Sequence, residues 1–143
     1  MKNLSEELRK TVLEAEQKLN SIKDWDYRTA PGKWSKKQIL GHLIDSAANN
    51  HQRFVRIQYE DTPLITYDQN KWVEVQKYND APVELLINLW ISYNKHLAFV
   101  ISQLSAEALS RKCNIGKEEP VTLEFIATDY LRHLKHHFEQ VKS

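Results

Sequence analysis

The sequence is poor in glycine, proline and cysteine and has no long apolar segment. Three glycines and four prolines among 143 residues are too few for a sheet with many turns, and they favour helices joined by a few loops. The single cysteine, Cys113, excludes an intrachain disulfide and makes the cytoplasm the expected location. No apolar run approaches the ~20 residues of a membrane span, and the N-terminus has no apolar signal-peptide core. We therefore expect a cytoplasmic protein without a membrane partner.

An excess of one charge is also missing. The chain has 20 basic and 19 acidic residues, for a net charge of +1, and the two signs are interspersed. A protein that neutralises nucleic-acid phosphates would show a basic patch, so no nucleic-acid partner is expected. The hydrophobic fraction of 41% is that of an ordinary globular protein. The length suits a single domain with its own core, and we assign residues 1–143 to it.

Apolar periodicity predicts four long helices, over residues 5–22, 35–59, 82–101 and 123–141. Ser35 and Gln38 form a capping box at the start of the second helix, and Thr122 is the expected cap of the last. A long crossover, residues 60–82, contains a short predicted helix over 69–76, and residues 105–120 are expected to form a loop. This pattern predicts an all-α fold, a four-helix bundle with a long crossover between the second and third helices.

Gly41 lies inside the second predicted helix. Glycine in a helix interior costs ~1 kcal/mol relative to alanine, so its presence there needs a packing or functional reason. We expect another backbone to approach closely beside His42.

Histidine spacing indicates a metal site. His133 and His137 stand four residues apart, so both rings lie on one face of the last helix, as in the paired histidines of a zincin helix. His42 is the expected third ligand. Three imidazoles leave an open coordination position, which is typical of catalytic rather than structural zinc sites, and nickel, copper or iron would also suit these ligands. The sequence contains no Glu-x-x-His or His-Glu-x-x-His motif, which excludes di-iron carboxylate and zincin sites.

Polar residues extend this pattern along both helices. The line on the second helix is His42, Ser46, Asn49 and Arg53, and its counterpart on the last helix is Asp129, His133, His137 and Gln140. Asp129 is a candidate acceptor for a ring N–H of His133, and Arg53 is a candidate to bind a substrate carboxylate or phosphate. Simpler interpretations stay open: the first line is a solvated face, the histidine pair is a surface feature, or Asp129 forms a salt bridge with Arg132 or Arg53.

The remaining reactive residues receive structural interpretations. His51 and His96 lie off both lines and are expected to be structural, and His136 is expected to be exposed or to lie behind the ligands. Cys113 has no matching base nearby in the sequence, which argues against a nucleophilic role.

Several segments together resemble the DinB-like (YfiT-like) metalloenzyme family. They are Gly32–Ser35, Ile39–Ser46, Asn49, Arg53, Trp72, Gln76, Tyr78, Asp129–Tyr130 and the run His133-x-x-His136-His137-x-x-Gln140. The similarity spans residues 32–140, and the order and spacing of the segments carry it rather than any single motif.

The resemblance implies a four-helix bundle, usually a homodimer, with a divalent metal on His42, His133 and His137. Some family members are S-transferases that use bacillithiol or mycothiol, and others are called metal-dependent hydrolases. The chain lacks the extra domain of the mycothiol branch, so we expect a bacillithiol-type S-transferase or a hydrolase that uses zinc or nickel on a small molecule. The alternatives are a non-catalytic metal or small-molecule binding bundle in stress response, and a structural bundle without a site.

Overall fold

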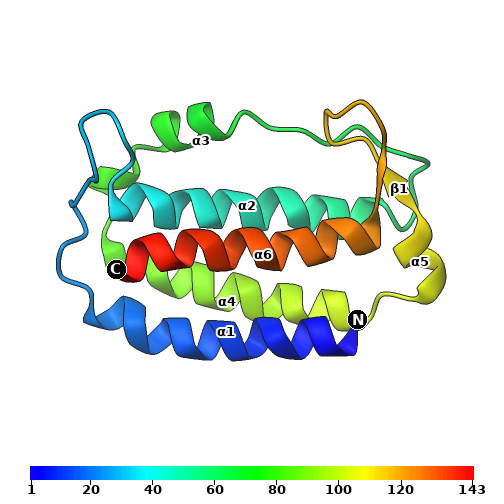
Figure 1. Ribbon diagram of the computed structural model, residues 1–143, viewed down its shortest axis with the longest axis horizontal. Coiled ribbons are helices and arrows are strands. Elements are labelled where there is room, and N and C mark those ends of the chain that lie inside the picture. The colour runs from blue at the N-terminus through cyan, green and yellow to red at the C-terminus, as the bar shows by residue number, and fades with distance from the viewer.

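The computed structural model describes residues 1–143 and is a four-helix bundle (Figure 1). The bundle helices are α1 (Lys2–Ser21), α2 (Lys36–Arg56), α4 (Val83–Ser102) and α6 (Leu123–Lys142). The crossover after α2 carries α3 (Gln69–Gln76) and the single-turn helix η1 (Tyr78–Asp80). The predicted fold class, the four helices and the short helix over residues 69–76 are therefore confirmed.

The direction of the helices explains why the crossover is long. Helix α2 packs against α4, and α6 packs against both α2 and α1. The chain runs the same way along α2 and α4, and the opposite way along α1 and α6 (Figure 1). Because α4 runs parallel to α2, it can begin only after the chain has returned along the whole length of the bundle. Residues 57–82 make that return. They pass over the outer side of α2, where α3 lies (Figure 1).

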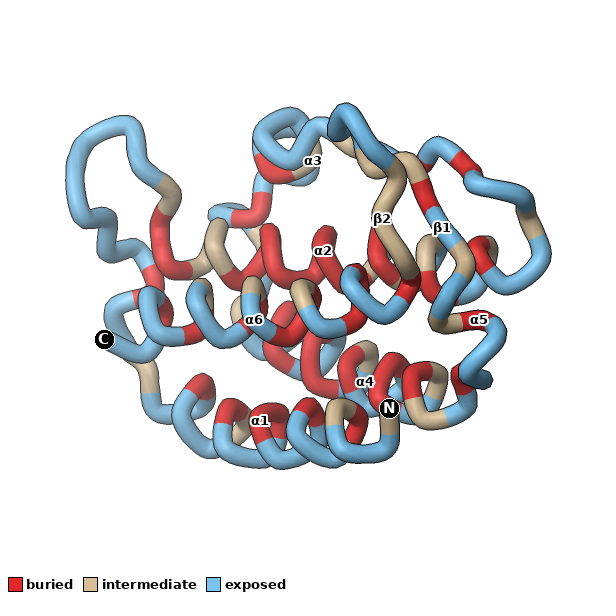
Figure 2. The backbone as a smooth tube through the Cα atoms, turned by 45° about the vertical axis from the view of Figure 1, so that its right-hand side comes forward, coloured by how far each residue is buried: buried red, intermediate tan, exposed pale blue.

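One apolar core joins the four helices. It contains 32 buried apolar residues, and on α1 these recur as Leu8, Val12, Ala15 and Leu19, the spacing of one helix face. Figure 2 shows the buried positions turned inward and the exposed ones outward. None of the helices combines the length and apolarity needed to cross a membrane.

Side-chain caps fix the first residues of the two helices that carry the histidines. Ser35 Oγ accepts from the backbone N–H of Gln38 at 3.1 Å, and Gln38 Oε1 accepts from the N–H of Ser35 at 2.9 Å. Thr122 Oγ1 likewise accepts from the N–H of Phe125 at 3.1 Å. These bonds pair backbone donors that the first helical turn leaves free, and they confirm both predicted caps.

Three details of the prediction were wrong, the first being the start of α1, which begins at Lys2 and not at residue 5. Residues 105–120 are not only a loop, because they contain α5 (Ala106–Ser110) and β1 (Lys112–Cys113), which pairs with β2 (Val121–Thr122). Ser105 caps α5 by accepting from the N–H of Ala108, a signal present in the sequence. In addition α2 ends at Arg56, since the next residues close tighter turns, with the N–H of Tyr59 donating to Arg56 O.

The reason for Gly41 also differs from the expectation. The group that approaches it is the side-chain ring of Tyr78, from η1, rather than another backbone. The crossover is thereby seated directly on α2, one residue before His42.

Candidate metal centre

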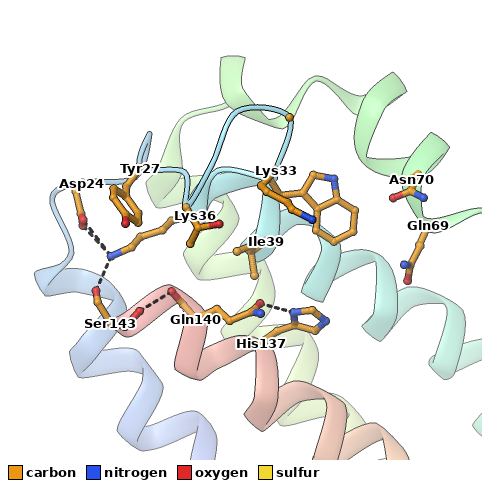
Figure 3. Close-up of a pocket in the computed structure, with 13 residues that line it drawn as sticks. Asp24, Tyr27, Lys33, Lys36, Ile39, Gln69, Asn70, His137, Gln140 and Ser143 are labelled. Carbon is orange, nitrogen blue, oxygen red and sulfur yellow. Dashed lines mark hydrogen bonds and ion pairs between the residues drawn. The ribbon is translucent and has the colours of Figure 1, made fainter.

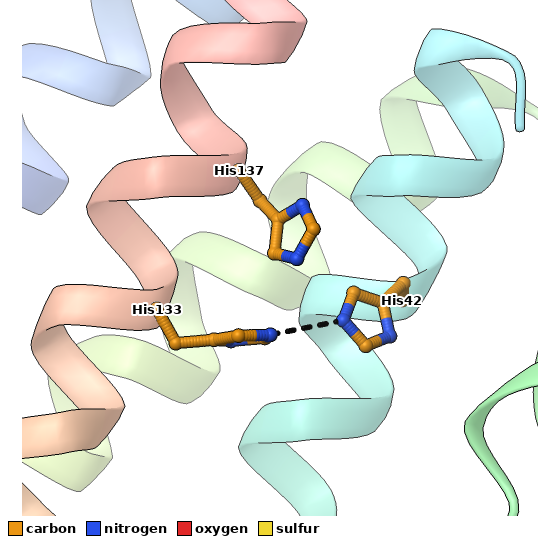
Figure 4. Close-up of side chains that lie close together, drawn as sticks. All are labelled: His42, His133 and His137. Atoms are coloured by element: carbon orange, nitrogen blue, oxygen red, sulfur yellow. Dashed lines mark hydrogen bonds between the residues drawn. The ribbon is translucent and has the colours of Figure 1, made fainter.

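Three histidines converge between α2 and α6. His42 extends from α2 and His133 and His137 extend from α6 toward the same point (Figure 4). The Nε2 atoms of His42 and His133 are 3.2 Å apart, and the potential ligand atoms of all three residues lie within 4.8 Å of one another. The structure thus brings together the three residues that the sequence suggested as ligands.

The geometry fits a small divalent cation. Two imidazole nitrogens at 2.0–2.1 Å from one tetrahedral zinc ion are about 3.3 Å apart, close to the separation of His42 and His133. No further histidine, cysteine or carboxylate joins the cluster. A bound ion would therefore keep an open position, as catalytic sites do.

Burial keeps the three rings neutral. Desolvation, and then the proximity of His133 and His137, lowers the pKa of His42 to about 3. Desolvation, followed by the charge of His137, lowers the pKa of His133 to about 4, and burial also lowers the pKa of His137. Metal ions bind neutral imidazole, so protons compete little for these nitrogens at neutral pH.

The other histidines take no part in the cluster. His136 is exposed, with its ring centroid 5.2 Å from that of His137. His51 Nδ1 lies 2.9 Å from the Tyr93 hydroxyl, and its ring contacts His96 with 5.3 Å between centroids. These last contacts join α2 to α4.

Asp129 and Arg53 lie beside the cluster but bind other groups. Asp129 pairs with Arg132 at 2.7 Å, as one of the simpler interpretations expected, and makes no hydrogen bond to His133. Arg53 donates to the carbonyl of Ile65 at 2.8 Å, which ties α2 to the crossover. Both residues, together with His133, line a cavity of about 120 Å³.

The polar line on α2 is not a solvated face. His42, Ser46 and Asn49 are buried, and Ser46 lines the same small cavity. The Asn49 side chain instead donates to Asp45 O of its own helix, at 2.9 Å. The line is therefore an interior polar feature between α2, α6 and the crossover.

A larger cavity opens on the other side of the cluster. Its volume is about 620 Å³, and His137 lies in its wall (Figure 3). The loop between α1 and α2 contributes Lys33, and the start of α3 contributes Gln69 and Asn70 (Figure 3). Trp34 also lines it and lies over His42, with 4.8 Å between ring centroids. The histidines thus separate a large polar cavity from a small one.

Asp45, which is buried one turn after His42, was not among the predicted site residues. Asp45 Oδ1 accepts from the Tyr78 hydroxyl at 2.6 Å and from Gln76 Nε2 at 2.8 Å, so it fastens the crossover to α2. A carboxylate among apolar residues is the sequence signal for a buried polar contact. Its partners lie 31 and 33 positions further along the chain, so the sequence did not identify them. Gln140 was likewise placed on the polar line without a partner, and its Oε1 lies 2.8 Å from His137 Nδ1.

Sequence comparison finds relatives along nearly the whole chain. The family profile of the DinB superfamily matches residues 6–141. A protein of Oceanobacillus iheyensis is 28% identical over 137 residues, which cover 95% of this chain and 76% of the relative. A Bacillus cereus protein is 27% identical over 144 residues, covering 100% of this chain and 80% of the relative. Both carry the provisional name metal-dependent hydrolase.

Solved structures share the fold. YfiT from Bacillus subtilis, described as an unusual four-helix bundle, superposes with a TM-score of 0.88 at 23% identity and covers 97% of this chain and 82% of its own. A mycothiol-dependent maleylpyruvate isomerase superposes with a TM-score of 0.79 at 13% identity, over 99% of this chain and 60% of its own. These similarities confirm the bundle topology.

Proposed function

The chain belongs to the DinB superfamily, and we propose that it is an enzyme that holds a divalent metal ion, zinc or nickel, on His42, His133 and His137. The observation that carries the proposal is the convergence of three neutral imidazoles, one buried and two half-buried, from two helices without a fourth protein ligand. Without an ion, this largely enclosed cluster would bring unprotonated nitrogens together with few hydrogen-bond donors to satisfy them.

An ion with an open position lowers the pKa of a thiol or water bound there and so supplies a nucleophile near neutral pH. The chain contributes the environment for that chemistry. Trp34 lies over His42 and limits the access of bulk water to its ring. The cavity of about 620 Å³ beside His137 is in the size range of small-molecule sites, about 300–1,000 Å³.

We favour transfer of a low-molecular-weight thiol of the bacillithiol type to a small electrophile, with hydrolysis as the second reaction. In the transfer, the sulfur forms a bond to an electrophilic carbon, the leaving group departs with its bonding electrons, and the thiol proton passes to the leaving group or solvent. Two cavities flanking the histidines suit a reaction with two substrates. One structural neighbour is itself mycothiol-dependent, so the fold is compatible with a thiol cosubstrate.

The smaller cavity supports roles for Arg53 and Asp129. The guanidinium of Arg53 lines it and would bind an anionic group of the substrate. The carboxylate of Asp129 lines the same cavity as His133 and would accept the remaining N–H of that ring if it left Arg132. A homodimer and a cytoplasmic location remain predictions from the sequence.

Metal content is the first test, measured by mass spectrometry on untagged protein after loading with zinc or nickel. We expect about one ion per chain in the wild type and its loss in His42→Ala and His137→Ala. His136→Ala is the matched control, because His136 is exposed beside His137 and outside the cluster, and it should keep the ion. A wild type that binds neither metal would refute the proposed centre.

Turnover is the second test. Thiols of several sizes are combined with model electrophiles, and esters and amides are supplied without thiol. Thiol-dependent turnover that disappears in His42→Ala supports the transferase, and thiol-independent turnover supports the hydrolase. Stoichiometric metal without turnover on any substrate would favour the non-catalytic binding bundle.

A further inference from the structure

Two buried polar atoms on α2 lack a hydrogen-bond partner. They are Nδ1 of His42 and Oδ2 of Asp45, and the only other such atom is Nε1 of Trp90. His42 and Asp45 stand three residues apart, so they lie on neighbouring turns with Cβ atoms about 5–6 Å apart. Each residue is 1% exposed, so bulk water cannot satisfy either atom.

The two atoms are chemically complementary. A neutral imidazole that offers the Nε2 lone pair carries its proton on Nδ1. His42 Nε2 is the nitrogen that faces His133, and Figure 4 shows the other nitrogen of its ring pointing away from both partner histidines. Metal binding at Nε2 would therefore create a buried N–H donor at Nδ1, and Asp45 Oδ2 is a buried acceptor without a donor.

The carboxylate of Asp45 is already oriented. Its Oδ1 accepts from both Tyr78 and Gln76, which leaves Oδ2 for a third partner. Burial raises the pKa of Asp45, and a further donor would stabilise the charged form. Gln140 gives a parallel within the same cluster, because its Oε1 contacts Nδ1 of His137 at 2.8 Å.

We propose that Asp45 is a positioning residue of the metal centre, whose Oδ2 accepts the Nδ1–H of His42 directly or through one water molecule. This fixes the tautomer and orientation in which Nε2 faces the metal. The inference rests on the proposed function, since it requires that His42 is a ligand. It also links the metal centre to the crossover, because Tyr78 and Gln76 hold the same carboxylate.

Zinc affinity of the full chain, measured by competition with a chromophoric chelator, tests the role. In Asp45→Asn the amide oxygen remains for Tyr78 and Gln76, and an NH₂ group then faces Nδ1 of His42 and disfavours a proton there. We expect zinc to bind about 10–100-fold more weakly. Tyr78→Phe is the matched control, because it removes a donor to Oδ1 and leaves Oδ2 in place, and its affinity should stay within about threefold of the wild type.

The outcomes separate positioning from anchoring. If Asp45 only fastens the crossover, Asp45→Asn and Tyr78→Phe weaken zinc binding equally, and the proposal is overturned. Unchanged affinity in Asp45→Asn overturns it as well. If the wild type binds no zinc, the proposed function itself is refuted. If the wild type binds zinc but no more tightly than Asp45→Asn, only the role of Asp45 is refuted.

Nitrogen-15 NMR of the zinc-loaded wild type gives a second readout that does not depend on the variant folding. We expect His42 to show a protonated Nδ1 with slow solvent exchange, and in Asp45→Asn this signal should shift and exchange faster. A wild-type ring with its proton on Nε2, or with a rapidly exchanging Nδ1–H, would contradict the assignment.

Discussion

The ring of Tyr78 occupies the space that a side chain at position 41 would need. A Cβ on Gly41 would lie 2.2 Å from Cδ2 and 2.4 Å from Cγ of Tyr78. The hydroxyl of the same tyrosine donates to Asp45 at 2.6 Å, so the ring cannot withdraw without breaking that bond. Gly41 thus permits the crossover to rest on α2 between His42 and the start of the helix.

Gly41→Ala should therefore destabilise the protein although alanine is the better helix former. The higher helix propensity of alanine would add about 1 kcal/mol to the free energy of unfolding, whereas overpacking would subtract about 1–3 kcal/mol. Because the contact is short and the ring is held by its hydroxyl, we expect a cost at the upper end of that range. We expect a net loss of about 1–2 kcal/mol in the free energy of unfolding, measured in urea. In a Tyr78→Ala background the same substitution should be neutral or stabilising. Equal effects in both backgrounds would show that the ring is not the cause.

The fold was predictable because local signals agreed with one another. The capping residues Ser35 and Thr122 begin α2 and α6 where the structure has them, and the apolar stripe of α1 matches its buried face. The short elements between residues 105 and 122 were missed because a five-residue helix and two-residue strands have too few positions to show a period.

The candidate ligands were predictable from spacing along each helix, whereas the hydrogen-bond partners of the other polar side chains were not. His133 and His137 follow from the helical repeat, and His42 was predicted as the third ligand beside a polar line on the second helix, in agreement with the family resemblance. The partner of a polar side chain depends on which elements meet in space. Asp129 has an adjacent arginine on its own helix and binds it, while Asp45 binds Tyr78 and Gln76 across the crossover. Helical periodicity contains no information on contacts of that kind.

A buried polar pair in the bundle interior gives a second prediction. The Tyr130 hydroxyl donates to Asn94 Oδ1, and Asn94 is 0% exposed. Tyr130→Phe leaves that oxygen without a donor, which should lower the free energy of unfolding by about 1–3 kcal/mol. Tyr93→Phe is the control, because Tyr93 is half-buried and contacts the side chain of His51, so water can replace its hydrogen bond and the loss should stay below about 1 kcal/mol. Urea unfolding of both variants measures the difference, and equal losses would mean that burial of the acceptor is unimportant.

The metal-free protein should lose stability as the pH falls from 6.5 toward 4. The folded-state pKa of His42, about 3, and of His133, about 4, lie below the ordinary value of 6.5, so in this window the unfolded chain takes up protons that the folded chain does not. Unfolding then becomes easier by at most about 1.4 kcal/mol per pH unit for each ring, with a smaller share from the partly exposed His133. Above pH 6.5 the contribution is fully present and constant.

Urea unfolding in the presence of a chelator, for the wild type and His42→Gln, measures the slope. Carboxyl groups titrate alike in both proteins, so His42→Gln should show the shallower slope. Identical slopes would mean that folding does not lower the pKa of His42.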